Sequence, residues 1–144
     1  MNWLSYAIDY GIIGLLLLMS FAAVALAVER YLTYRQVEVR TYVDRKELEL
    51  LLSSRLHLLA TIGSNAPYIG LLGTVLGIML TFQTMGRSGF MDTGKIMVGL
   101  AMALKVTAAG LLVAIPTIVV YNLLQRRRQV LLTQWEIQHG RQNL

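Results

Sequence analysis

A stretch of 21 residues without a charged side chain, at positions 66–86, constrains this chain more than any other feature of its sequence. That is the length an α-helix needs to cross the hydrocarbon core of a bilayer. At helical periodicity the small residues share one flank, and the large apolar residues share the other. A small-residue flank is typical of a helix that packs closely against other helices or lines a polar path. This small flank consists of Ala66, Gly70, Gly73, Thr74, Gly77, Thr81 and Thr84.

Two further apolar runs, at 11–28 and 96–125, predict a membrane protein. The chain is 56% apolar and 15% charged, whereas soluble domains are about 45–50% apolar and about 25% charged. The ten residues before the first run contain Trp3, Tyr6 and Tyr10, which suit an interfacial aromatic belt. They contain no Lys or Arg, which a cleaved signal peptide would carry, so we predict a retained first span.

The third apolar run is longer than a bilayer requires. As a helix its 30 residues would extend about 45 Å, so it must tilt or project beyond the membrane. It contains one charge, Lys105, and one proline, Pro116. Its small flank consists of Gly99, Ala103, Thr107, Gly110, Ala114 and Thr117. The residues predicted to allow close helix packing are Gly70, Gly73, Gly77 and Gly110, of which Gly73 and Gly77 form a GxxxG pair.

These patterns predict an all-α membrane protein with three transmembrane helices, of which the second and third are long and extend into the cytoplasm. We expect a single domain over residues 1–144. Its predicted parts are a first span at 11–28, a cytoplasmic helical segment at 29–65, a second span at 66–86, a third span at 96–125 and a tail at 126–144 that continues as helix past Trp135.

The orientation follows from the positive charges. Six Lys and Arg lie between the first two spans and four follow the third, whereas two lie in the 87–95 link and none precede the first span. Because Lys and Arg concentrate on the cytoplasmic side, the N-terminus is predicted to face the periplasm and the C-terminus the cytoplasm.

The polar segment at 29–65 shows one clear helix start. Asp44, followed by Glu47, resembles a capping box, so we expect a helix to begin near Asp44 and run toward the second span. Ser64, Asn65 and Pro67 are expected to break or kink this helix. The segment is interpreted as a solvated helical hairpin arm, with a dedicated docking surface as the alternative.

Two threonines in the second and third spans are predicted to lie at one depth. Thr74 lies 12 residues before Gly86, and Thr107 lies 11 residues after Ile96, so each is roughly 17 Å along its helix. They form either a polar ring or helix contact, or they bond back to their own helices. Lys105 lies on another face, where it snorkels or pairs at a helix contact, or serves an ion-pair or pathway role.

The same sequence argues against several other functions. The second and third spans contain no Asp, Glu or His, so protons that cross here would need an acid from another chain. The net charge is +5, and the charged residues flank the apolar runs. Membrane topology therefore explains the charge better than binding to nucleic acid does. There is no cysteine, His57 has no metal-ligand neighbours, and no catalytic triad or phosphate loop is found. We therefore expect no enzyme activity, no cofactor and no metal.

Two long motifs resemble the ExbB/TolQ proton-channel family, which is distantly related to MotA. They are NAPYIGLLGTVLGIM at 65–79 and GLAMALKVTAAGLLVAIPTIVVYN at 99–122, and the short cytoplasmic segment resembles a compact member of the ExbB type. The resemblance implies a homopentamer around a central pore in the inner membrane. It also implies that an ExbD dimer inside the pore brings the essential aspartate, and that Thr74 and Thr107 line the pore beside it.

The implied activity is use of the proton motive force to drive TonB, which energises uptake of iron complexes and vitamin B12 across the outer membrane. The alternatives are a TolQ-type subunit that powers Tol-Pal envelope maintenance, or a non-conducting membrane scaffold. One position departs from the family pattern: the segment GIAEAL reads GLAMAL here, so Met102 replaces a glutamate. Lys105 stands where the family has an apolar residue.

Overall fold

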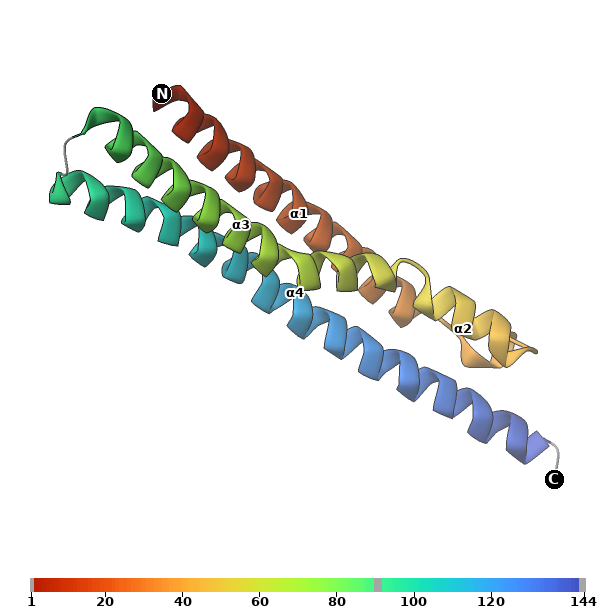
Figure 1. The fold of residues 1–144 in the computed structure, drawn as a ribbon. Coiled ribbons are helices and arrows are strands. Elements are labelled where there is room, and N and C mark those ends of the chain that lie inside the picture. Colours follow the sequence, from red (N-terminus) through yellow and green to blue (C-terminus); the bar gives the residue numbers. More distant parts are fainter. Residues whose placement is uncertain (1, 90–91, 143–144) are drawn as a thin grey trace.

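Three long helices lie side by side in the computed structural model, which describes residues 2–89 and 92–142 (Figure 1). The elements are α1 (Asn2–Gln36), the short 3-10 helix η1 (Val39–Thr41), α2 (Arg45–Ser53), α3 (Leu56–Ser88) and α4 (Thr93–Gln142). Helices α1, α3 and α4 are each long and apolar enough to cross a membrane. The prediction of an all-helical chain with three such helices is confirmed.

The bundle has two distinct ends. The N-terminus and the connection between α3 and α4 lie at one end, which we call the link end, and α2 and the C-terminus lie at the other, which we call the basic end (Figure 1). Helix α4 continues without interruption to Gln142, so the expected continuation past Trp135 is confirmed. Gly89 ends α3 at the link end with a left-handed backbone (φ 65°), and its N–H donates to the Met85 carbonyl.

The closest packing in the bundle is between α3 and α4, along the two small-residue flanks. A Cβ added at Gly110 would lie 2.8 Å from the Ala66 carbonyl oxygen and 3.0 Å from Cα of Gly70. A Cβ added at Gly77 would lie 3.2 Å from Cβ of Ala103. These glycines therefore allow contact between helices of one chain, and the large residues of the opposite flank of α3 are exposed: Leu72, Val75, Met79 and Phe82.

The predicted helix start at Asp44 is confirmed, but the predicted path to the second span is wrong. The Asp44 side chain accepts a hydrogen bond from the Lys46 backbone N–H at 3.0 Å. Helix α2 then ends at Ser53, and Arg55 turns the chain with a left-handed backbone (φ 63°). This turn allows leucines on both sides of it to enter one core, namely Leu48, Leu52, Leu56 and Leu59.

Of the break or kink predicted at Ser64, Asn65 and Pro67, the break is wrong, because α3 runs through Pro67 to Ser88. A proline inside a helix removes one backbone donor, and apolar helices tolerate this when neighbouring groups satisfy the freed carbonyls. The carbonyl that lacks its helical donor here is that of Gly63, four residues before Pro67. Gly63 in the same turn accepts the side chain of Ile118 from α4, so the helix is supported from outside.

The segment at 29–65 is not a solvated arm. Tyr34 and the four leucines named above are buried in one core together with Ala23 of α1 and Leu124, Leu131 and Leu132 of α4. The segment therefore folds back onto the basic ends of α1 and α4 and fixes their separation.

Substitution of Gly110 by alanine tests the close packing of α3 and α4. The added methyl group would overlap the α3 backbone, so we expect a loss of stability of about 1–3 kcal/mol. Gly14→Ala is the matched control, because nothing lies within 4 Å of its added Cβ. Thermal unfolding of both purified variants measures the difference, and equal midpoints would contradict the packing described.

Candidate functional site

The hydroxyl groups of Thr74 and Thr107 lie against each other in the seam between α3 and α4. Thr74 is buried and Thr107 is half-buried. Counting residues from the ends of the two spans predicted that Thr74 and Thr107 lie at one depth, and the structure places their hydroxyl groups in contact. The sequence left open whether the threonines contact the other helix or bond back to their own. Thr74 does both, since it contacts Thr107 and its hydroxyl lies 3.3 Å from the Gly70 carbonyl of its own helix.

The hydrogen bonds around Thr74 determine how the pair can act. Its oxygen lies 3.0 Å from the Ala103 carbonyl, which is the shorter of its two carbonyl contacts. A hydroxyl has one proton, so when Thr74 donates to a carbonyl, Thr107 must donate to Thr74. The lone pairs of Thr107 then remain free on its half-buried side. Thr107 can therefore accept a hydrogen bond from a water or an acid that approaches this side.

The glycines singled out in the sequence surround this pair. Gly70 faces Thr107, Val106 and Gly110 of α4, and Gly77 faces Ala103. Gly73 lies against Val106 of α4, and it also accepts Ile12 of α1. The seam therefore places the three apolar helices in contact at the depth of the hydroxyls.

Lys105 and Met102 lie elsewhere on α4. Both side chains are exposed in the single chain, and Met102 is 41% exposed. The prediction that Lys105 does not share the threonine face agrees with this placement. Among the described residues no cluster of three His, Cys, Asp or Glu could hold a metal ion.

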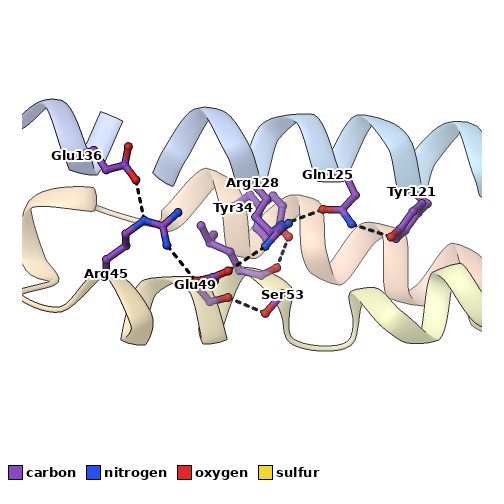
Figure 2. Close-up of polar contacts among 9 residues, drawn as sticks. Tyr34, Arg45, Glu49, Ser53, Tyr121, Gln125, Arg128 and Glu136 are labelled. Atoms are coloured by element: carbon purple, nitrogen blue, oxygen red, sulfur yellow. Dashed lines mark hydrogen bonds and ion pairs between the residues drawn. The ribbon is translucent and has the colours of Figure 1, made fainter. Parts of the chain in front are cut away.

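A second polar feature, which the sequence did not predict, lies at the basic end (Figure 2). Arg45 of α2 binds Glu136 of α4 at 2.7 Å and Glu49 at 3.2 Å. Arg128 of α4 lies 3.6 Å from the other oxygen of Glu49 and donates to Gln125 at 2.9 Å. These side chains connect α2 to two turns of α4. Because they are only partly buried, each pair contributes modestly on its own.

Two residues of α1 satisfy the last carbonyls of α2. The Tyr34 hydroxyl donates to the Leu52 carbonyl, and Arg30 donates to the Leu51 carbonyl at 3.0 Å. The final carbonyls of a helix lack partners within it, and a cation is favourable at that end. One sequence signal points to the burial of Arg30, which follows Leu16 and Ala23 at seven-residue spacing on the buried side of α1.

Comparison with known proteins agrees with the motifs and the fold. The model of the MotA/TolQ/ExbB proton channel family matches residues 32–137 of this chain. "Putative biopolymer transport protein ExbB-like 2" of Helicobacter pylori is 57% identical over 92% of this chain and 88% of its own length. "Biopolymer transport protein ExbB" of Aquifex aeolicus is 54% identical over 92% of this chain and 90% of its own length. "Tol-Pal system protein TolQ" of Pseudomonas aeruginosa is 38% identical over 67% of this chain and 41% of its own length.

Substitution of Tyr34 by phenylalanine tests the capping of α2. The Leu52 carbonyl would be left buried without this donor, which costs about 1–3 kcal/mol. Tyr31→Phe is the matched control, because Tyr31 is one turn away and 56% exposed. Thermal unfolding of the two variants compares them, and a drop for Tyr31→Phe as large as that for Tyr34→Phe would contradict the assignment.

Proposed function

Because the chain belongs to the MotA/TolQ/ExbB proton channel family, we propose that it is the channel-forming subunit of a complex that converts the proton motive force into mechanical work. Its three apolar helices and its family make it a multi-pass membrane protein. In our proposal it lies in the inner membrane, with the link end toward the periplasm and the basic end toward the cytoplasm. The distribution of Lys and Arg supports this orientation.

The observation that carries the proposal is the hydroxyl pair of Thr74 and Thr107 inside an apolar bundle. Neither α3 nor α4 places an acidic residue near this pair, and a hydroxyl does not titrate at ordinary pH. In our proposal a carboxyl group from a second polypeptide occupies the free side of Thr107. When this acid is protonated it donates a hydrogen bond to the Thr107 oxygen, and when it has lost the proton it accepts one from water held there.

We propose that the working assembly is a homopentamer with a dimer of single-span ExbD in its central pore. The family to which the chain belongs supports this assembly. In it, large exposed side chains such as Leu72, Leu104 and Leu112 contact neighbouring chains or lipid. Lipids cover the outer surface of this assembly. Movement of the inner dimer, coupled to proton passage, then acts on TonB to energise uptake of iron complexes or vitamin B12 across the outer membrane.

The comparisons favour the ExbB type over the TolQ type for this proposal. The ExbB-like relative of Helicobacter pylori and the ExbB of Aquifex aeolicus match 88–90% of their own length at 54–57% identity, whereas the TolQ relative matches 41% of its length at 38% identity. A gene for TonB beside the gene for this chain supports the first type, and a gene for Pal supports the second. A non-conducting scaffold is the outcome in which the threonine substitutions below change nothing.

Substitution of Thr107 by alanine tests the proposed role of the hydroxyl pair. Loss of one hydrogen bond of about 1 kcal/mol at the transition state corresponds to a roughly fivefold slower proton flux. The measurement is proton flux in liposomes that contain the chain together with the proposed single-span ExbD partner. Native mass spectrometry of the same samples checks that assembly is unchanged.

Thr84→Ala is the matched control. The Thr84 hydroxyl donates to the Leu80 carbonyl of its own helix at 2.8 Å, and Thr84 is exposed, so its loss should leave the flux unchanged. Unchanged flux for Thr107→Ala and Thr74→Val in an assembled complex would refute the role of the pair.

A further inference from the structure

Residues 3–28, 58–86 and 96–125, which form the apolar lengths of α1, α3 and α4, contain one acidic and one basic side chain. These are Asp9 of α1 and Lys105 of α4. A charged side chain within a bilayer costs several kcal/mol unless it finds a partner or water, so each of them needs an explanation.

The packing of the helices places the two residues at similar depths. Ile12 and Val106 both lie against Gly73, and the Ile12 side chain would be 3.1 Å from a Cβ added there. Asp9 is three residues from Ile12 toward the link end, and Lys105 is one residue from Val106 in the same direction. At 1.5 Å per residue their backbones differ in depth by about 3 Å, which a lysine side chain spans easily.

Each residue also continues a line of side chains along one groove between α1 and α4, where Lys105 lies at the outer rim because Leu112 on the same line is 75% exposed. Helices α1 and α4 run in the same direction and border a groove of about 100 Å³, which is lined in part by Ala23 and Leu112. Asp9 precedes Leu16 and Ala23 at seven-residue spacing, and Lys105 precedes Leu112 by the same spacing. Residues seven apart share a helix face, so the line of the groove continues toward Asp9 on one side and Lys105 on the other.

Neither Asp9 nor Lys105 has a polar partner among the described residues of the single chain. Asp9 is half-buried and Lys105 is exposed, and in the part of the chain that the structure describes neither makes a hydrogen bond or ion pair. Helix α3 offers no alternative, because residues 58–86 carry no charge.

We propose that Asp9 and Lys105 form an ion pair within the chain, which holds the link ends of α1 and α4 together inside the membrane. This inference rests on the membrane placement given under the proposed function. The pair acts as a positioning device: it keeps α1 seated on Gly73, beside the seam that holds Thr74 and Thr107. The ammonium group and the carboxylate cancel each other's cost in the bilayer, and the lysine side chain extends toward the link end, as side chains of α4 do.

Cross-linking in membranes tests the proximity of the two positions. The sequence has no cysteine, so Asp9→Cys together with Lys105→Cys introduces the only two thiols. A short bifunctional maleimide should join them within one chain, seen as a monomer-sized band of altered mobility. Phe21→Cys with Lys105→Cys is the control that should not react, because Phe21 is 77% exposed and lies deeper on α1. Absence of the intrachain product, or products only between chains, would overturn the proposal.

Charge removal tests whether the two groups are energetically coupled. Asp9→Asn and Lys105→Met each leave one unpaired ion, so each should lower the unfolding midpoint in lipid nanodiscs by about 5 °C. The double variant should recover most of that loss, because it leaves no ion behind. Losses that simply add in the double variant would overturn the pair.

Neither measurement requires proton conduction. A complex without flux that still shows the cross-link and the recovery contradicts the proposed function alone. Normal flux without the cross-link contradicts the ion pair alone.

Discussion

The structure depends on how closely α3 approaches α4. Only glycine leaves room where Gly110 meets the Ala66 carbonyl and Gly70, and this approach brings the Thr74 oxygen within 3.0 Å of a carbonyl on the other helix. In a membrane, helices gain little from burying apolar surface, so association relies on dispersion contacts and on polar groups that meet across the seam. The glycines and the threonines therefore act together: the glycines allow the two backbones to approach, and this approach allows the hydroxyl groups to form hydrogen bonds across the seam.

At the basic end, a short helix ends inside a core, where its last carbonyl groups need hydrogen-bond donors from outside the helix. Helix α2 is nine residues long, and its last carbonyls face α1. Arg30 and Tyr34 satisfy them from the continuation of the first apolar helix, so α2 is attached to α1 by hydrogen bonds and to α4 by Arg45 and Arg128. The segment between the first two apolar helices thereby becomes part of the bundle instead of a separate arm.

Sequence reasoning succeeded where local periodicity and a short connection leave few choices. The link between α3 and α4 is too short for any arrangement but an antiparallel pair, so counting residues from each end was enough to bring Thr74 beside Thr107. It failed where the outcome depended on tertiary contacts. The turn at Arg55 has no glycine that would indicate a left-handed backbone, and the helix through Pro67 is supported by the contact of Gly63 with Ile118 of α4. The roles of Thr74, Thr107 and Lys105 in ion movement remain predictions that only measurement on the assembly can test.

The uninterrupted length of α4 makes it a lever. Thr107 and Trp135 are separated by 28 residues of one helix, a distance of about 42 Å at 1.5 Å per residue. A tilt of about 5° with its fulcrum at Thr107 would move the backbone at Trp135 sideways by roughly 4 Å, on the geometry of a rigid rod. Pro116 lies between the two points and removes one backbone hydrogen bond, so the rod is most compliant there. A tilt at the hydroxyl pair would therefore reach the far end in full only while α4 stays straight at Pro116.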